Sequence, residues 1–259
     1  MNHNEKVKYL KRCILQASYT TQKGYLASSF SIMDILVVLY DKVMRINGSD
    51  LKDTTNDRLV LSKGHAAFGL YAVLADKGYF DIEELNTFGQ YGSRLGLMPD
   101  RNKAPGIEFS TGSLGHGLPC AIGTALGCKI KRMPNRVFVI VGDGELNEGT
   151  MWESILIVPQ LALNNICCIV DDNLSSLPSI NYDDLEMKFR AFRWDAITVD
   201  GHNAEELYKA FSMNSGKPTV IIAKTIKGRG CRLMEENPQL WHSKYPTTHE
   251  LEMMMEELH

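Results

Sequence analysis

The sequence lacks several features that would place the chain in a specialised class of protein. Lysine and arginine number 28 against 31 aspartates and glutamates, so no basic excess favours nucleic acid as a partner. No apolar run reaches the length of a membrane span. The polar N-terminus, residues 1–8, has no signal-peptide core. These absences lead us to expect a cytoplasmic globular protein.

Regularly spaced cysteines are also missing. None of the six cysteines belongs to a Cys-x-x-Cys motif, and most stand in apolar segments: Cys13, Cys120, Cys128, Cys167, Cys168 and Cys231. Such residues are expected to be buried free thiols, because disulfides and zinc sites show regular cysteine spacing. No internal repeat, low-complexity segment or linker divides the 259 residues. We therefore expect a single domain, 1–259, with a substantial core.

What the sequence does contain is an alternation of short apolar strands and helices. Strands are predicted at 58–62, 136–141, 166–171, 196–199 and 218–223. Helices are predicted at 5–23, 32–43, 66–77, 119–131, 150–163, 183–192 and 204–213. This order predicts an α/β fold with an open, mostly parallel twisted sheet and helices on both faces.

Three segments carry more specific expectations. Ser31 has Asp34 three residues later, which predicts that Ser31 is the N-cap of the helix at 32–43. That helix is apolar nearly all round, so it is expected in the core or in a subunit contact. Residues 89–110 have no periodicity and form a long loop of functional or interfacial type, and residues 225–246 are expected to form an ordered loop.

Two predicted strands end in oxygen-bearing side chains. Asp143 follows the second strand, Asn173 follows the third, and the helix at 150–163 joins them. A strand–helix–strand unit makes the two strands parallel and brings both residues to the carboxyl edge, where open α/β sheets bind ligands. The pair is therefore a candidate site for a small hard cation such as Mg²⁺. The alternative is that Asp143 caps a turn and Asn173 only ends a strand.

Two more segments lie where a strand passes into a helix. His65 follows Ser62-Lys-Gly at the end of the first strand, which favours a ligand-binding role over that of a surface histidine. The glycine-rich turn at 110–118 opens the helix at 119–131, and a helix N-terminus attracts anions. The same glycines would also allow that helix to pack tightly on a neighbour, and both roles are compatible.

Several sequence motifs occur together along nearly the whole chain. Val141-Gly-Asp-Gly-Glu145, with 28 residues between Gly144 and Asn173, is similar to the thiamine diphosphate (ThDP) motif. The further motifs are Leu61-Ser-Lys-Gly-His65, Ser110-Thr-Gly-Ser-Leu-Gly115, Val199-Asp-Gly-His202, Lys224-Thr-Ile-Lys-Gly-Arg-Gly230 and Trp241-His242. Together they resemble the N-terminal, diphosphate-binding domain of transketolase. The resemblance implies a ThDP-binding fold and the N-terminal subunit of a split transketolase.

The resemblance also implies roles for individual residues. Asp143, Asn173 and the backbone carbonyl of Ser175 would bind Mg²⁺, or another divalent cation such as Ca²⁺ or Mn²⁺. His65 and His242 would contact the diphosphate or the reaction intermediate, which makes them the catalytic candidates. The residues expected around the cofactor are His65, Gly112, Ser113, Leu114, Gly144, Glu145, Glu148, Asn173 and His242.

A two-chain enzyme follows from the same resemblance. A separate chain with the pyrimidine-binding domain would supply the glutamate that activates ThDP, so this chain alone would be inactive. Together the chains would transfer a two-carbon unit, ketol or acyl, between a small-molecule donor and acceptor. An α2β2 heterotetramer is expected, with Glu148 near the cofactor or interface. The segments 32–43 and 89–110 are the interface candidates.

Two residues depart from the family pattern. Tyr25 and Met98 stand where transketolases have histidines that hold the hydroxyls of a ketose donor. Tyrosine still donates one hydrogen bond and methionine donates none. We therefore weigh an ordinary ketose donor against a less hydroxylated one, such as a 2-oxo acid or other acyl donor. Two further hypotheses are a non-catalytic ThDP-domain paralogue with a binding or regulatory role and an unrelated Mg²⁺-dependent α/β enzyme.

Overall fold

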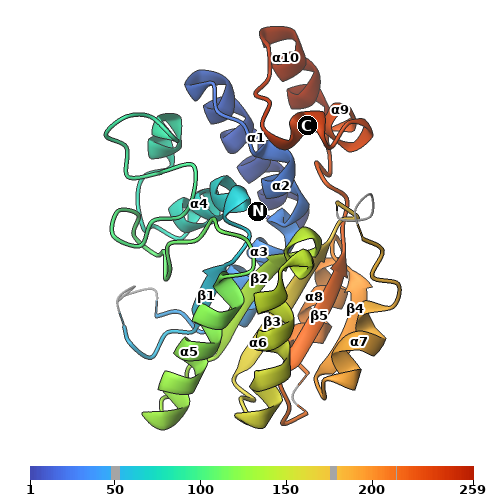
Figure 1. Cartoon of the computed structure of the whole chain (residues 1–259). Helices are drawn as coiled ribbons and strands as arrows, with labels where there is room; N and C mark the ends of the chain where they lie inside the picture. Colours follow the sequence, from blue (N-terminus) through green and yellow to red (C-terminus); the bar gives the residue numbers. More distant parts are fainter. Residues whose placement is uncertain (48–52, 176–179, 214) are drawn as a thin grey trace.

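A computed structural model describes residues 1–47, 53–175, 180–213 and 215–259. Within them, five strands form one sheet in the order β1-β2-β3-β5-β4, and all neighbouring pairs are parallel (Figure 1). The strands are β1 (Arg58–Leu61), β2 (Val137–Gly142), β3 (Ile166–Asp172), β4 (Asp195–Asp200) and β5 (Thr219–Lys224). The predicted open α/β sheet is confirmed.

Helices cover both faces of the sheet because successive strand residues point to opposite sides. Val139 and Val141 face α5 (Gly117–Ile130), α6 (Gly149–Gln160) and α7 (Leu185–Ala191), which lie in front of the sheet in Figure 1. Phe138 and Ile140 belong to the other core. That core includes side chains of α3 (Met33–Val38) and α8 (Ala204–Phe211). The strands are buried on both faces, which explains their continuous apolar sequences.

Beyond the carboxyl ends of the strands, a second group of helices gathers in the upper half of Figure 1. These are α1 (His3–Thr21), α2 (Leu26–Ser31), α4 (Ala67–Asp76), α9 (Arg232–Glu236) and α10 (Thr248–Glu257). The chain ends therefore meet, because α1 packs against α10. This arrangement places the first and last segments of the chain over the same edge of the sheet.

The predicted helix at 32–43 is present from Met33, but its predicted N-cap is wrong. Residues 26–31 are already helical, α3 follows after Ile32, and a π-helical turn covers Leu39–Val43. Ser31 is not an N-cap, because its hydroxyl donates to the carboxylate of Asp171 at 2.7 Å. Side chains from Ile32 to Leu39 are buried within the chain itself. The core alternative holds, and this stretch is not available as a subunit interface.

The two predicted loops, 89–110 and 225–246, are largely irregular in the structure. Apart from η3 (Ile82–Thr87), the segment between α4 and α5 has no described helix or strand. The tail at 225–246 is irregular except for α9 and a 3-10 turn at Leu240–His242. Pro159 is the penultimate residue of α6, in accord with the tendency of proline to end a helix. In the described ranges, no helix has both the length and the apolar composition needed to cross a membrane.

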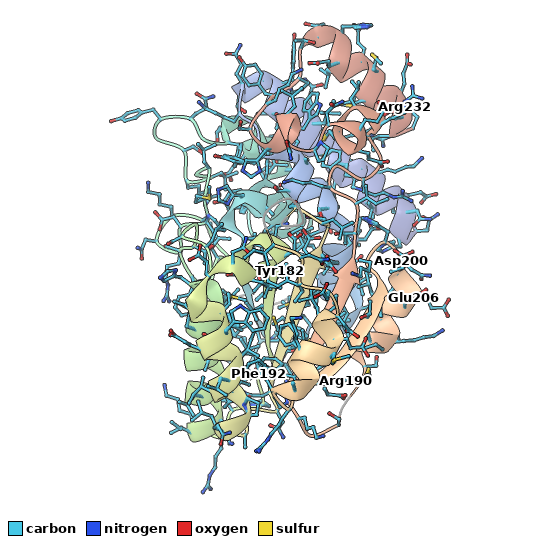
Figure 2. The ribbon with its side chains drawn as sticks, turned by 45° about the vertical axis from the view of Figure 1, so that its right-hand side comes forward. Tyr182, Arg190, Phe192, Asp200, Glu206 and Arg232 are labelled. Carbon is cyan, nitrogen blue, oxygen red and sulfur yellow. The ribbon has the colours of Figure 1, made fainter. Side chains whose placement is uncertain are left out.

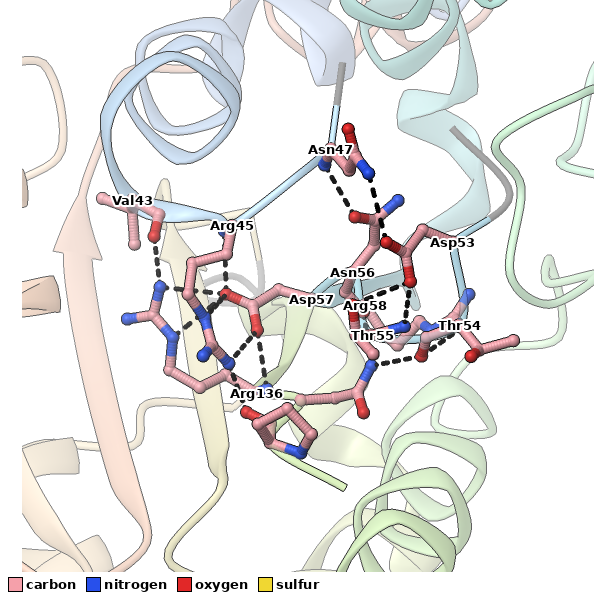
Figure 3. Close-up of polar contacts among 12 residues, drawn as sticks. Val43, Arg45, Asn47, Asp53, Thr54, Thr55, Asn56, Asp57, Arg58 and Arg136 are labelled. Carbon is pink, nitrogen blue, oxygen red and sulfur yellow. Dashed lines mark hydrogen bonds and ion pairs between the residues drawn. The ribbon is translucent and has the colours of Figure 1, made fainter. Parts of the chain in front are cut away.

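At the amino edge of the sheet, Asp57 joins three segments (Figure 3). Its fully buried carboxylate accepts hydrogen bonds from the guanidinium groups of Arg45 and Arg136 at 2.9 and 3.0 Å. The backbone amides of the same two residues donate to it at 2.9 and 2.8 Å. Burial alone would raise the pKa of Asp57, but these hydrogen bonds lower it below its ordinary value. We call Arg45, Asp57 and Arg136 the Asp57 cluster.

Candidate cofactor and metal site

Asp143 and Asn173 lie at neighbouring strand ends, as their order in the sequence predicts. Asp143 begins a 3-10 turn directly after β2, and Asn173 directly follows β3. The two strands pair in parallel, with Gly142 opposite Asp171. Asp143 is buried and accepts a hydrogen bond from the Gly144 amide at 2.8 Å. The predicted metal ligands Asp143 and Asn173 therefore lie at the same carboxyl edge of the sheet.

Ser175 lies against Asn173 rather than apart from it. Its backbone amide donates to Asn173 Oδ1 at 3.2 Å, and its hydroxyl donates to the same atom. The side-chain oxygen of Asn173 thus faces Ser175. We call Asp143, Asn173 and Ser175 the oxygen set. Their binding of a cation stays a prediction.

Glu145 was expected at the cofactor, but its carboxylate is bonded within the protein. It accepts hydrogen bonds from the Ser62 hydroxyl at 2.7 Å, the Gly115 amide at 2.8 Å and the Gly142 amide at 2.9 Å. Burial raises the pKa of Glu145, and these bonds partly oppose the shift. The residue therefore ties the ends of β1 and β2 to the glycine-rich turn.

The glycine-rich turn approaches its neighbours too closely for side chains. Gly112 has φ of 150°, and a Cβ there would lie 3.1 Å from Met98 Cγ. Gly115 has φ of 81°, and a Cβ there would lie 2.7 Å from Glu148 Cβ. Gly64, next to His65, packs directly on the Gly112 backbone. The turn with Ser113 and Leu114 is thereby held beside His65, and Glu148 beside the turn.

Three rings form a cluster at this edge, which we call the aromatic triangle. The ring of Tyr25 lies edge-on to His65 and His242, with centroids 5.2 and 5.6 Å away, and the two histidines are 5.4 Å apart. Burial lowers the pKa of both histidines, and the charges of Lys63 and Lys227 lower it further. The two predicted catalytic histidines therefore lie together, although 177 positions separate them in the sequence (242 − 65).

Close backbone contact holds His242 in this cluster. A Cβ on Gly24 would lie only 2.0 Å from the carbonyl oxygen of Ser243. Tyr25, the next residue, has a left-handed φ of 69°. The turn between α1 and α2 thus touches the C-terminal tail. Nothing in the local sequence reveals this contact, because it joins the two ends of the chain.

Two lysines complete the site, and sequence patterns alone did not single them out. The buried Lys63 donates to the carboxylate of Asp171, and Lys227 Nζ donates to Ser175 Oγ at 3.2 Å. Burial lowers the pKa of Lys227, and the neighbouring charge of Lys63 lowers it further. We call Lys63, His65, Lys227 and His242 the donor set. The Ser-Lys-Gly-His turn could have indicated the lysine as well as the histidine.

Around Asp171 lies a second buried group that the sequence did not reveal. Its carboxylate contacts Ser31, Lys63, Asn173 and Thr225, and we call these five residues the Asp171 cluster. Asp171 is 0% exposed and stands two residues before Asn173. Further out, the hydroxyl of Tyr182 donates to Asn147 Oδ1. Figure 2 shows Tyr182 and Asp200 at this end of the sheet, and Phe192 further down near the end of α7.

The chemistry of the two sets fits a diphosphate with its cation. Carboxylate, amide and carbonyl oxygens suit Mg²⁺, and ammonium groups and histidines suit phosphate oxygens. Among the described residues, no group of three or more His, Cys, Asp and Glu side chains could hold a metal alone. A cleft of about 430 Å³ at the amino edge, lined in part by Arg136 and Phe211, contains none of the predicted site residues. The residue types at this edge, and not the size of a cavity, therefore identify this site.

Comparisons with known proteins identify the family of the chain. Residues 2–245 match the family described as transketolase, thiamine diphosphate binding domain. The chain is 38% identical over 220 residues to a 6-deoxy-6-sulfo-D-fructose transketolase subunit of Clostridium sp. (strain MSTE9), covering 82% of this chain and 80% of that one. It is 35% identical over 262 residues to an apulose-4-phosphate transketolase subunit of Actinobacillus succinogenes, covering 98% and 95%.

Full-length transketolases match over part of their length only. Human transketolase is 38% identical over 251 residues, which cover 95% of this chain and 40% of the human protein. The solved structure of transketolase from Leishmania mexicana superposes with a TM-score of 0.89 at 27% identity, covering 100% of this chain and 41% of that one. By its sequence and its fold, the chain belongs to the transketolase thiamine diphosphate-binding domain family.

Proposed function

We propose that the chain is one subunit of a two-chain, transketolase-like transferase that moves a two-carbon unit, ketol or acyl, with ThDP and Mg²⁺. The observation that supports it most strongly is the meeting of the oxygen set with the donor set at one edge of the sheet. One set suits the cation and the other suits the diphosphate. Ca²⁺ or Mn²⁺ would suit the same oxygens.

The division of the enzyme into two chains is supported by the relatives. Those named as transketolase subunits align over most of their own length, whereas this chain spans 40% of human transketolase. We infer that the chain works as one domain, 1–259. A separate subunit would carry the pyrimidine-binding domain and its glutamate in an α2β2 assembly. The six free cysteines fit the reducing cytoplasm.

In this proposal the residues of this chain bind, orient and balance charge. When bound, ThDP supplies the carbanion chemistry. The oxygen set would hold the cation, and the ammonium groups of Lys63 and Lys227 would offset the negative diphosphate. His65 and His242 have lowered pKa values, so at neutral pH each offers one N–H donor and one acceptor nitrogen. They can therefore exchange protons with oxygen atoms of a substrate.

The identity of the substrate that donates the two-carbon unit is a second question, and two observations bear on it. Tyr25 packs against both histidines of the donor set, and Met98 packs against Gly112. Both residues that replace family histidines thus lie at the proposed site. Because methionine donates no hydrogen bond to a hydroxyl oxygen, an acyl donor such as a 2-oxo acid is the second candidate. Glu148 and the loop at 89–110, where the side chain of Tyr91 is fully exposed, are proposed to face the partner subunit.

A native pull-down of the chain from its own cell extract tests the proposal, with mass spectrometry of bound proteins and bound small molecules. We expect a second chain with a pyrimidine-binding domain, together with ThDP. An Asp143→Ala variant should lose ThDP and serves as the control. Recovery of the chain alone, without ThDP even when Mg²⁺ is supplied, would contradict the proposal and favour a non-catalytic paralogue.

If the complex is recovered, a panel of ketose phosphates and 2-oxo acids identifies the donor class. The double variant Tyr25→His, Met98→His is the matched comparison. We expect it to gain activity with ketose donors relative to 2-oxo acids. Unchanged donor preference would show that these two positions do not select the donor.

A further inference from the structure

We propose that Asp171 is a positioning residue that fixes the orientation of the Asn173 side-chain amide, so that Oδ1 and not Nδ2 faces the divalent cation. This assignment rests on the proposed function, since it gives Asp171 a task within the same site. It concerns a residue that neither the strand pattern nor the predicted ligand set singled out. The observations that carry it are the contacts of the Asp171 cluster.

Every group that contacts the Asp171 carboxylate can donate a hydrogen bond. Ser31 Oγ lies 2.7 and 2.9 Å from the two carboxylate oxygens, and Asn173 Nδ2 lies 2.8 Å from one of them. The ammonium of Lys63 and the hydroxyl of Thr225 complete the set. A carboxylate accepts hydrogen bonds and donates none when it is ionised. These contacts therefore all suit a hydrogen-bond acceptor at Asp171.

This acceptor decides which way Asn173 turns. The two ends of an asparagine amide have similar shape, so hydrogen-bond partners determine its orientation. Nδ2 of Asn173 donates to Asp171 and also to Ser31 Oγ at 3.1 Å. The opposite orientation would place Oδ1 against the Asp171 carboxylate, with two acceptors facing each other. Oδ1 is therefore directed away from Asp171, toward Ser175.

Asp171 can hold Asn173 because Asp171 is itself fixed from three directions. Lys63 comes from the turn after β1, Ser31 from the end of α2, and Thr225 from the residue after β5. These residues are 108, 140 and 54 positions away in the sequence. With no exposed surface, the carboxylate has no room to move. Buried groups of this kind set the orientation of the ligands they contact.

The neighbouring Asp172 provides a matched control. It lies on the same strand, one residue nearer to Asn173, and its carboxylate pairs with Lys224, whose side chain is 54% exposed. In contrast to Asp171, its partner is a surface lysine rather than the Asn173 amide. Asp171→Asn and Asp172→Asn therefore make the same chemical change at adjacent positions. Only the first alters the acceptor that the Asn173 amide uses.

The experiment titrates Mg²⁺ into each purified variant at saturating ThDP and follows binding by circular dichroism. Thermal unfolding without ligand is recorded for the same samples. We expect about 10- to 100-fold weaker Mg²⁺ binding for Asp171→Asn, the usual effect of removing a partner behind a metal ligand. Asp172→Asn should bind Mg²⁺ as the wild type does. A lower melting temperature with unchanged Mg²⁺ affinity would show a purely structural role and overturn the inference.

Two further outcomes distinguish a failure of the proposed function from a failure of the inference. If the wild type binds neither ThDP nor Mg²⁺, the proposed function is wrong and the inference falls with it. If the wild type binds both and Asp171→Asn binds equally well, only the inference is wrong. Should Asp171→Asn fail to fold, Ser31→Ala decides, since Ser31 holds both oxygens of Asp171 and also accepts from Asn173 Nδ2. We expect several-fold weaker Mg²⁺ binding there, and wild-type affinity would overturn the inference.

Discussion

Two buried aspartates at opposite edges of the sheet are satisfied in different ways. Asp57, at the amino edge, is bonded by two arginines and two backbone amides. Asp171, at the carboxyl edge, is bonded by one lysine, two hydroxyls and an asparagine amide. Both carboxylates are fully buried, with side chains 0% exposed. They differ in whether their bonding partners also belong to the proposed ligand site.

The two arginine partners of Asp57 also bond to other groups of the protein. Arg45 and Arg136 also donate to the carbonyls of Pro134 and Val43, so the Asp57 cluster is closed. Asn173, by contrast, is both a partner of Asp171 and a member of the oxygen set, and Lys63 stands near Lys227 and the histidines. The amino edge thus serves stability. The carboxyl edge keeps like charges and desolvated donors together, an arrangement typical of binding sites.

The largest effect on stability is expected at the amino edge. Asp57→Ala should lower the free energy of unfolding by about 3 kcal/mol, because it leaves two guanidinium groups without their carboxylate. That figure is at the lower end for a buried pair, since the side chain of Arg45 is 54% exposed. Urea denaturation measures it, with Asp53→Ala in the same segment as the control. A large loss of ThDP affinity in a folded Asp57→Ala protein would break the comparison.

A smaller loss is expected where the tail meets the turn before α2. Gly24→Ala places a Cβ 2.0 Å from the Ser243 carbonyl oxygen, so the backbone must shift. We expect the free energy of unfolding to fall by about 2 kcal/mol. ThDP binding, measured by calorimetry, should weaken as well, because His242 moves with Ser243. Gly127→Ala on α5 is the control, since a Cβ there meets nothing within 4 Å. Equal effects of both changes would contradict the predicted contact.

Lys227→Met separates binding from stability. The methionine removes a desolvated charge from the neighbourhood of Lys63, so the protein without ligand should become more stable. ThDP should bind about tenfold more weakly, because a charged donor to the diphosphate is lost. Thermal unfolding and calorimetry measure the two effects. Lys224→Met, whose partner is Asp172, should leave ThDP affinity unchanged. Loss of both stability and affinity would place Lys227 with the Asp57 cluster as a structural residue.

The smallest effect concerns pH. His65 and His242 have pKa values below their ordinary 6.5 in the folded state, so below that pH the unfolded chain binds more protons. Their contribution to stability is therefore lost as pH falls from 6.5 through the folded pKa values. Denaturation of the double variant His65→Gln, His242→Gln from acid to neutral pH should show a shallower acid dependence than the wild type. His249→Gln, which changes an exposed histidine outside the aromatic triangle, is the control.

Sequence patterns predicted the sheet well because its determinants are local. Every predicted strand overlaps an observed one, since buried parallel strands are short, continuous apolar runs between turns. Ser31 shows the limit of this reasoning. Ser31 and Asp34 have the spacing of a helix cap, but a carboxylate 140 residues away takes the Ser31 hydroxyl. A tertiary contact of that kind overrides a local capping preference.

The site residues also divide into those that the sequence predicts and those that only tertiary contacts reveal. Asp143 and Asn173 could be predicted to meet, because the order of strands alone brings them to one edge. Lys227 and Asp171 could not, because their roles depend on contacts between distant turns, whereas the Ser-Lys-Gly-His turn could have indicated Lys63. Glu145 was expected at the cofactor, but only the folded chain shows Ser62 and Gly115 bonded to it. Residue type alone does not distinguish a ligand from the group that holds a ligand.

The left-handed backbone of Tyr25 has a consequence for how this site changes over evolution. Bulky residues adopt a positive φ with difficulty, whereas histidine, like asparagine and aspartate, is found there more often. The backbone at position 25 therefore accepts histidine at least as well as tyrosine. An exchange between the two would alter the ring that meets both histidines of the donor set without remodelling the turn. Under the proposed function, a single substitution at this position would change the donor preference while the scaffold stays intact.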